Sequence, residues 1–270
     1  MGLPVIKAHA YGNDFLFVPG PPGRDPHLLV RVLCQRHQGI GADGVIFYTL
    51  RDRGATMELF NADGSASELS GNGLRCLAAL VVRAQGLAPG ATVTVDTGAG
   101  VKTLELLSRE GARVTFRAAL GQPTDVREVQ ISVLGETLRA TTLGMGNPPC
   151  IVLGALPDTE RFMRLGPALS THAMFPAGTN VEFAHVEAPD RVRILIWERG
   201  VGPTTSSGTG TAASAVAAVA HGGASRAVDV VAPGGTQRVE WREDGVYLTG
   251  WAEVVFEGEW IGDVAAPGRC

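Results

Sequence analysis

The chain has 270 residues, of which 45% are hydrophobic and 19% charged, and its formal net charge at pH 7 is −4. This length and composition predict a globular protein with a large core, divided most naturally into two domains, and exclude a disordered chain. The chain lacks a run of lysine and arginine that could follow a nucleic-acid backbone, and its apolar runs are too short to span a bilayer. We therefore expect no nucleic-acid partner, no membrane association and a cytoplasmic location.

The first half of the chain predicts strands that lead into one helix. A glycine turn opens the alternating stretch GIGADGVIF, and the apolar segment MELF is followed by polar turn residues. A helix is expected after Ser70, because SGNGLRCLAALVVRAQG combines a glycine-rich turn, an alanine- and leucine-rich stretch and a terminal glycine. Further strands are expected in ATVTVDTG and ARVTFRAAL, and the half should end near LGQPTD.

The second half repeats this order of elements. Strands are expected in REVQISV, in AGTNVEFAHV after its glycine turn, and in VRILIW before a polar turn. A second helix is expected after Ser207 in SGTGTAASAVAAVAHGG, and QRVEWRE and GVYLTGWAEVVFEGEW predict closing strands. We therefore predict an α/β fold with two pseudo-symmetric halves, residues 1–120 and 121–270, each with short strands wrapped around a central helix. A doubly wound sheet would need many more helices.

The two glycine-rich turns indicate where a ligand would bind. Such a turn leaves backbone N–H groups at the start of the helix, and these groups can hold an anion. Two turns in equivalent places predict a cleft between the halves in which both helix starts face one small carboxylate. The alternative is that each turn is a glycine-lined helix start without a ligand.

The sequence contains four cysteines, Cys34, Cys76, Cys150 and Cys270. They form no CxxC pair and are widely scattered, which favours reduced, mostly buried thiols over a disulfide framework. His9, His37 and His172 lie far apart and no HxH or HxxxH pair occurs, so we expect no metal.

Seven stretches, taken in order, resemble the diaminopimelate epimerase family along essentially the whole chain. They are HAYGNDF (9–15), CQRHQGIGADG (34–44), FNADGS (60–65), SGNGLRC (70–76), MGNPP (145–149), FPAGTNVEF (175–183) and ERGVGPTTSSGTG (198–210). The resemblance implies the family fold, in which two pseudo-symmetric α/β halves hold an amino-acid substrate between them. In the family, one cysteine thiolate removes the α-proton and a cysteine thiol on the other face returns one. The resemblance also implies a small amino-acid-like substrate, no cofactor and a possible homodimer.

The departures from the family pattern concern its proton carriers. Ser70 and Ser207 stand where the family has its two cysteines. The pKa of a thiol can be lowered so that a thiolate forms at neutral pH, whereas a serine hydroxyl needs a partner base to act there. This excludes the two-thiol mechanism. Pro149 and Pro203 also stand where the family has a histidine and a glutamate. A Cys-to-Ser trapped form of a working epimerase would leave these two positions unchanged, so the combined changes favour an altered natural mechanism.

The family motifs indicate which residues would hold the substrate. The matching side chains are those of Asn13, Asn61, Asn147, Asn180 and Arg199. The backbone N–H groups that would bind the α-carboxylate belong to Gly71, Asn72, Gly208 and Thr209. An arginine can bind a carboxylate through two parallel hydrogen bonds, and the retained set argues for an amino-acid-like ligand. Taken alone, each asparagine is more typical of a turn.

Glu198 is the first candidate for the catalytic base. It precedes the second turn, lies beside the second thiol in the family, and would gain a raised pKa from burial. The alternative is that Glu198 only pairs with Arg199 or with the substrate's ammonium group. Ser70 and Ser207 are candidate hydrogen-bond donors or proton relays, or else simple helix N-caps. His9, Asp63 and Glu68 are weaker candidates for the base. Cys76 is predicted to lie in the core.

One base in place of two opposed thiols can remove a proton and return it on the same face of an extended system. We therefore predict a cofactor-independent isomerase that performs a double-bond shift or tautomerisation on an amino-acid-derived carboxylate, in a specialised biosynthetic pathway. Relatives that resemble phenazine-pathway isomerases perform this kind of double-bond shift with a carboxylate base on a similar fold. One alternative is a diaminopimelate epimerase, natural or trapped by substitution, in lysine or cell-wall synthesis. The other is a non-catalytic amino-acid-binding or scaffold protein.

Overall fold

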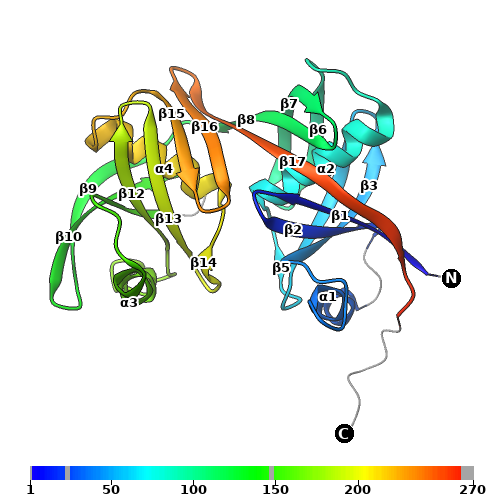
Figure 1. The fold of residues 1–270 in the computed structure, drawn as a ribbon, viewed down its shortest axis with the longest axis horizontal. Coiled ribbons are helices and arrows are strands. Elements are labelled where there is room, and N and C mark those ends of the chain that lie inside the picture. Colours follow the sequence, from blue (N-terminus) through cyan, green and yellow to red (C-terminus); the bar gives the residue numbers. More distant parts are fainter. Residues whose placement is uncertain (1, 22–24, 146–148, 263–270) are drawn as a thin grey trace, which may run out of the picture. The chain divides into compact units, whose positions relative to one another are not determined.

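The computed structural model describes residues 2–21, 25–145 and 149–262 of the chain. These residues form two compact units (Figure 1). The described residues of unit 1 run from Gly2 to Arg117 and resume at Trp251, and unit 2 comprises those within Ala118–Gly250. The chain passes from one unit to the other within two strands, β8 (Arg113–Gly121) and β17 (Gly245–Trp260). The sequence placed residues 251–270 in the second half, whereas the described ones among them, residues 251–262, join unit 1.

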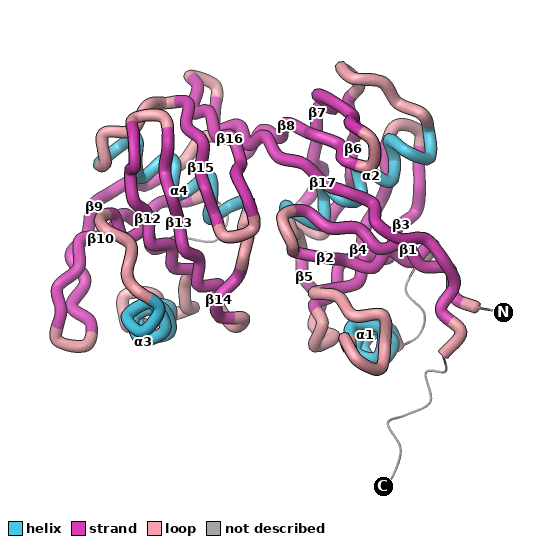
Figure 2. Tube along the Cα trace, viewed as in Figure 1, coloured by secondary structure: helices cyan, strands magenta, loops and turns pink. Residues whose placement is uncertain are grey.

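Unit 1 consists mainly of strands, as Figure 2 shows. Its elements before β8 are β1 (Leu3–Ala10), β2 (Asn13–Pro19), α1 (Pro26–Cys34), β3 (Gly44–Arg51), β4 (Gly54–Asn61), β5 (Ala66–Ser67), α2 (Gly71–Gln85), β6 (Thr92–Thr97) and β7 (Gly100–Glu110). The last part of β17 pairs antiparallel with β1, from Leu3 opposite Trp260 to His9 opposite Glu253. This pairing explains why the C-terminal strand belongs to the N-terminal unit.

Unit 2 repeats this order of elements. It contains β9 (Thr124–Val133), β10 (Glu136–Gly144), β11 (Pro149–Leu153), α3 (Thr159–Ser170), β12 (Asn180–Ala188), β13 (Arg191–Glu198), β14 (Gly202–Thr204), α4 (Gly208–His221), β15 (Ala227–Ala232) and β16 (Gly235–Arg242). The first part of β17 pairs with β16.

The pairing of the strands shows the internal repeat. In unit 1, β2 runs parallel to β3, β3 antiparallel to β4, and β4 parallel to β6. In unit 2, β11 runs parallel to β12, β12 antiparallel to β13, and β13 parallel to β15. The predicted α/β fold of two pseudo-symmetric halves is therefore confirmed.

The two long helices carry the predicted serine-led sequences and are deeply buried. In α2 every residue from Asn72 to Val82 is buried, and the helix packs against β1, β2, β4 and β6. In α4 the stretch from Gly210 to Ala218 is buried and packs against several strands of unit 2. The small side chains of α4 allow this close approach, and Ala212, Val216 and Ala217 belong to one core cluster with strand residues such as Ile194.

The prediction of one helix per half was wrong, because the described residues hold two in each. The extra helix α1 begins with Asp25 as N-cap and Pro26 in its first turn, and α3 begins with Asp158 as N-cap. Both starts are ordinary helix signals. The stretch of α3 also contains Gly166 and Pro167, which disfavour a helix interior, but its buried Phe162, Leu165 and Leu169 pack in a core cluster with β9 to β12.

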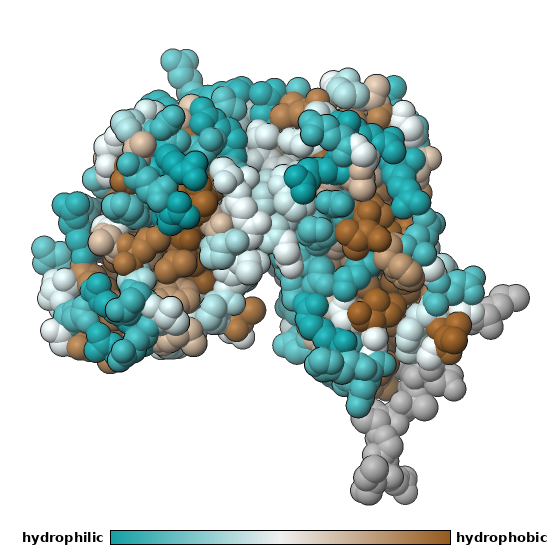
Figure 3. All heavy atoms as spheres, viewed as in Figure 1, coloured by the Kyte–Doolittle hydropathy of each residue, from teal (hydrophilic) through white to brown (hydrophobic). Residues whose placement is uncertain are grey.

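Hydrophobic side chains also reach the surface of each unit (Figure 3). In unit 1 the exposed ones include Leu50, Val255 and Phe256. The homodimer expected from the family resemblance stays a prediction. None of the helices among the described residues has the length and apolar character that a membrane span requires.

Candidate active site

Two serines open the two long helices in the same way. Ser70 is the N-cap of α2, and its Oγ accepts a 3.1 Å hydrogen bond from the N–H of Gly73. Ser207 is the N-cap of α4, and its Oγ accepts a 3.1 Å hydrogen bond from the N–H of Gly210. Both serines therefore have the capping role that the sequence left open. Because each oxygen accepts this bond, each hydroxyl can still donate its own proton.

The residues predicted to bind a carboxylate through their backbone are the first ones of these helices. Gly71 and Asn72 begin α2, and Gly208 and Thr209 begin α4. The first N–H groups of a helix have no partner within the helix and lie at the positive end of its dipole, so they suit an anion. Thr209 is exposed, and its Oγ1 lies 3.5 Å from Oγ of Ser207.

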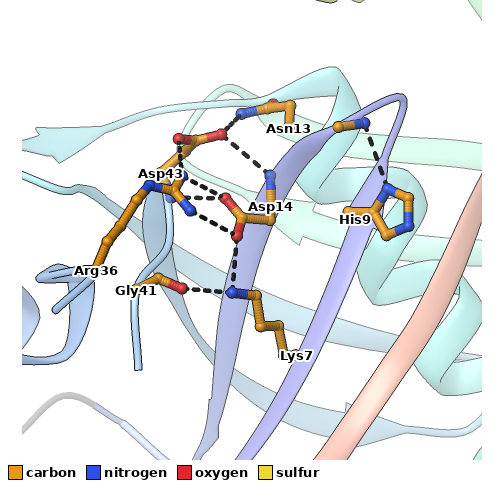
Figure 4. A network of polar contacts seen from close by, with 8 residues as sticks. Lys7, His9, Asn13, Asp14, Arg36, Gly41 and Asp43 are labelled. Atoms are coloured by element: carbon orange, nitrogen blue, oxygen red, sulfur yellow. Dashed lines mark hydrogen bonds and ion pairs between the residues drawn. The ribbon is translucent and has the colours of Figure 1, made fainter. Parts of the chain in front are cut away.

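In unit 1, the start of α2 is tied to the first residue of β2. Nδ2 of the buried Asn72 donates a 3.0 Å hydrogen bond to Oδ1 of Asn13, and Nδ2 of Asn13 donates a 2.7 Å bond to Asp43. The guanidinium group of Arg36 lies 2.9 Å from Asp14 and 2.8 Å from Asp43 (Figure 4). Two predicted ligand residues, Asn13 and Asn72, are thus brought together and held within a network of charged groups.

This network keeps Asp14 ionised. Burial by itself would raise the pKa of Asp14, but the hydrogen bonds from Arg36 and Lys7 outweigh it and hold that pKa below its ordinary value. The Nζ of Lys7 lies 2.9 Å from Oδ2 of Asp14 and donates a 2.6 Å bond to the Gly41 carbonyl. Asp14 is therefore a structural anion that fixes the position of its neighbour Asn13.

His9 has a local structural contact. Its Nδ1 accepts a 3.3 Å hydrogen bond from the N–H of Gly12. The imidazole ring meets the edge of Trp251 at 5.4 Å between ring centroids, and Tyr11 packs against the same indole at 4.4 Å. The backbone at Tyr11 has φ 56°, so these contacts hold a left-handed turn. His9 thus stabilises the turn that presents Asn13.

Asn61 and Asp63 form a turn at the end of β4. Nδ2 of Asn61 donates a 3.0 Å hydrogen bond to Oγ of Ser65, and Asp63 accepts bonds from the Ser65 hydroxyl at 2.6 Å and backbone N–H at 2.8 Å. These bonds lower the pKa of Asp63. Asp63 is thus a turn former and a poor base at neutral pH, and Glu68 is exposed.

In unit 2, three of the predicted residues lie at the facing ends of β12 and β13. Oδ1 of Asn180 accepts a 2.9 Å hydrogen bond from the N–H of Arg199, whose Nη1 donates a 2.6 Å bond to the Ala177 carbonyl. Glu198 is half-buried at the end of β13, and Arg199 is exposed. Asn147, the remaining predicted ligand residue, lies outside the described residues.

Sequence reasoning missed one acidic residue at this place, Glu182 on β12. The residue is 0% exposed, and no described group donates a hydrogen bond to either carboxyl oxygen. A Cβ added at Gly210 would lie 2.2 Å from Oε1 of Glu182 and 3.1 Å from Oγ of Ser207, so both oxygens lie beside the first turn of α4. The burial and the charge of Glu198 raise the pKa of Glu182 to about 8.

No local sequence signal reveals Glu182, because the alternation in the run VEFA is that of a half-exposed strand. Every residue from Val181 to Ala184 in the run VEFA is buried. Val181 and Phe183 join the core that contains α3, while Ala184 joins the core that contains α4. A strand with both faces covered has no solvent-facing side, so its acidic residue must be buried.

The thiols of the described residues cannot serve as bases at neutral pH. Cys34, Cys76 and Cys150 are free and buried, which confirms the expectation of reduced core thiols and of Cys76 in the core. Burial raises the pKa of Cys34 and of Cys150 to about 12, and it raises that of Cys76 as well. All three are neutral thiols at pH 7. Among the described residues, no group of three His, Cys, Asp or Glu side chains could hold a metal ion.

The chain also matches known proteins over nearly its whole length. The sequence pattern of the family "Diaminopimelate epimerase" matches residues 5–125 and 141–255. A diaminopimelate epimerase of Desulforudis audaxviator (strain MP104C) is 42% identical to it over 94% of this chain and 98% of the relative. One from Desulfitobacterium hafniense (strain DSM 10664 / DCB-2) is 40% identical over 97% of this chain and 99% of the relative.

Solved structures share the fold at low sequence identity. A probable proline racemase from Agrobacterium radiobacter K84 is 17% identical with a TM-score of 0.74, covering 98% of this chain and 94% of that one. A Bacillus anthracis phenazine biosynthesis protein of the PhzF family is 15% identical with a TM-score of 0.69, covering 97% and 99%. The full-length sequence match and the repeated α/β halves lead to one conclusion: the chain belongs to the diaminopimelate epimerase family.

Proposed function

We propose that this protein is a cofactor-independent isomerase that moves a proton on a small amino-acid-derived carboxylate, with Glu198 as the base. The observation that carries the proposal is that Ser70 and Ser207, which stand where the family resemblance implies two thiols, cap α2 and α4, while the half-buried Glu198 ends β13 and its charge acts on Glu182 beside the first turn of α4. The membership of an epimerase family supports isomerase chemistry. A role in a specialised biosynthetic pathway is part of the same proposal.

A carboxylate base fits this chain better than any thiol. A serine hydroxyl is not ionised at neutral pH, and the three described thiols are neutral for the reason given above. Glu198 is half-buried and lies where its charge acts on Glu182. A partly buried carboxylate next to another carboxyl group is the arrangement in which acid and base roles separate.

The proposed substrate is held by backbone and side-chain groups at the start of α4 in unit 2. The N–H groups of Gly208 and Thr209 would bind the α-carboxylate in unit 2, and those of Gly71 and Asn72 are the equivalent groups in unit 1. Arg199 is exposed and can donate further hydrogen bonds to an anion. Asn13 and Asn61 are the side chains of unit 1 that the family motifs predict as ligand residues.

The reaction is a proton shift without a change in oxidation state. The Glu198 carboxylate takes the proton from a carbon next to the bound carboxyl group, and the electrons of that C–H bond form a new double bond. The N–H groups at the start of α4 stabilise the enolate-like charge that develops. A proton is then added to a carbon further along the conjugated system, where the old double bond ends.

The test is solvent-proton exchange followed by NMR in D₂O. The panel contains diaminopimelate, common amino acids and unsaturated cyclic amino acids, and Glu198→Gln is compared with Glu187→Gln, an exposed glutamate on β12. Deuterium should enter a carbon beside an imine or alkene, and Glu198→Gln should lower this rate by about 10²-fold or more, as expected for a general base. Exchange that Glu198→Gln leaves unchanged would refute the proposal.

Diaminopimelate epimerisation is the second candidate, favoured by the 42% identity to an epimerase over 94% of the chain. It predicts exchange at the α-carbon of diaminopimelate, and a strong gain of that activity when Ser70→Cys and Ser207→Cys are combined. A ligand that binds measurably but exchanges no proton would instead identify an amino-acid-binding or scaffold protein.

A further inference from the structure

A buried carboxyl group lies behind the start of α4 and has no described hydrogen-bond partner. Glu182 is the third residue of β12, and its neighbours across the sheet are Ile151 on β11 and Ile196 on β13. Both isoleucines belong to the apolar core that surrounds α4. An unpaired polar group in such a place costs free energy, so a structural role alone does not explain why the residue is a glutamate.

The other half of the molecule shows what a purely structural residue looks like here. Ile46 is the third residue of β3, and a Cβ added at Gly73 would lie 2.8 Å from its Cδ1. Gly73 follows Ser70 at the same distance in sequence at which Gly210 follows Ser207. Ile46 in unit 1 and Glu182 in unit 2 are therefore equivalent. The aliphatic residue fills the space under the helix in one half, and a proton-carrying group fills it in the other.

A second equivalent pair shows the same asymmetry. β4 ends at Asn61 in unit 1, and β13 ends at Glu198 in unit 2. Asn180 and Glu182 are two residues apart and so lie on one face of β12. The register of β12 and β13 puts Ile196 and Glu198 on that same face. Unit 2 therefore has two carboxyl groups on the face that meets α4, where unit 1 has an isoleucine and an asparagine.

The surroundings of Glu182 favour its protonated form. Burial is the larger cause of its raised pKa, and the charge of Glu198 on β13 adds to it. The positive end of the α4 dipole acts in the opposite direction but is outweighed. On β11, Cys150 is itself a neutral thiol. On the other face of β12, Arg161 and Arg164 of α3 are paired with Glu136.

We propose that Glu182 is the acid partner of Glu198: it holds a proton behind Ser207 and returns it to the ligand through the Ser207 hydroxyl. This inference rests on the function proposed above and supplies the group that returns the proton. Ser207 gives its hydroxyl proton to the accepting carbon while its Oγ takes the proton of Glu182, which is left as a carboxylate. Glu198, protonated in the first step, then releases its proton to solvent, and Glu182 takes up a proton from solvent before the next turnover. Glu182 is thus a positioning residue that acts through Ser207.

The first test needs no ligand. Protein labelled with ¹³C at the glutamate side-chain carboxyl carbons is titrated from acid to alkaline pH and followed by NMR. One signal should titrate near pH 8 in the wild type, be absent from Glu182→Gln and remain in the Glu187→Gln control. Glu198→Gln should shift that titration to lower pH, because it removes a negative charge. If every glutamate titrates in the ordinary range, the proposal is overturned.

The second test follows the pH profile of deuterium exchange on the panel compound that exchanges fastest. The wild-type rate should fall above about pH 8, and Glu182→Gln should lower the rate at neutral pH by about 10²-fold, with little change in KM. Glu182→Asp should restore part of the rate, whereas Glu182→Met, which keeps the shape without the proton, should not. Exchange that depends on Glu198 but not on Glu182 would refute this inference alone, and no exchange by the wild type would refute both it and the proposed function.

Discussion

Nδ2 of Asn72 donates a 3.0 Å hydrogen bond to Oδ1 of Asn13, which joins the first turn of α2 to the first residue of β2. Oδ1 of Asn72 also accepts a hydrogen bond from the buried guanidinium group of Arg75. Both asparagines were predicted from the family motifs to contact the ligand. Their hydrogen bonds give them a second role, because they fix the backbone N–H groups at the start of α2 in place.

Replacing Asn72 by alanine should therefore destabilise the protein. The change leaves Arg75 without this acceptor inside the core, and a buried group that loses its partner costs about 1–3 kcal/mol, more when it is charged. We expect the free energy of unfolding, measured by urea denaturation, to fall by about 3 kcal/mol. Asn61→Ala is the matched control, since its bond to Ser65 is exposed and should contribute about 1 kcal/mol or less. Equal losses in the two variants would contradict this role for Asn72.

Gly210 should not tolerate a methyl group, because a Cβ there would lie 2.2 Å from Oε1 of Glu182. Gly210→Ala is expected to lower the free energy of unfolding by about 1–3 kcal/mol through overpacking. Gly73→Ala meets only the flexible end of Ile46 at 2.8 Å and gains helix propensity, so it should change stability by less than about 1 kcal/mol.

A double-mutant cycle identifies the cause of that clash. In a Glu182→Ala background, Gly210→Ala should lose most of its cost, giving a coupling free energy of at least about 1 kcal/mol. Purely additive effects would mean that the carboxyl group of Glu182 does not restrict position 210.

Glu182 should make stability depend on pH in a definite direction. Its pKa is about 8 in the folded protein against an ordinary value of 4.5, so between these pH values the folded state keeps a proton that the unfolded chain releases. Stability therefore falls as pH rises through this window, by up to about 1.4 kcal/mol per pH unit from this group. Glu182→Gln removes the effect, and its stability relative to the wild type should grow from pH 5 to pH 8 in thermal or urea unfolding. A difference that is constant over this range would contradict the raised pKa.

The two capping serines should be equal in stability and unequal in activity. Each Oγ accepts a 3.1 Å bond from the glycine three residues on, so Ser70→Ala and Ser207→Ala should each lower the free energy of unfolding by about 1 kcal/mol. Glu182 lies beside the first turn of α4, whereas Ile46 takes the equivalent place in unit 1. Ser207→Ala should therefore reduce deuterium exchange by about 10²-fold and Ser70→Ala by much less. Equal losses of exchange would argue against the asymmetry between the halves.

The sequence determined the two serine-capped helices, most of the strands, their repeated order and the family. These features depend on local patterns: a capping serine, glycine turns, a run of small and apolar residues, and alternation along strands. The helices α1 and α3 carried valid N-cap signals, but Gly166 and Pro167 disfavour helix in α3, and packing against the neighbouring core overrides that preference. The return of the last strand to unit 1 depends on pairing with β1, which lies at the far end of the chain.

The tertiary structure decided the character of the candidate site. An acidic residue in the run VEF reads as the polar side of a half-exposed strand, and only the covering of both faces of β12 by α3 and α4 makes Glu182 a buried acid. Likewise, Asn13, His9 and Asp63 appear in the sequence as possible ligands or bases, and their hydrogen bonds within unit 1 show what else they do. The groups that bury a side chain and bond to it come from segments distant in sequence. The fold, and not the local motif, therefore sets the pKa of the side chain and the chemistry it can perform.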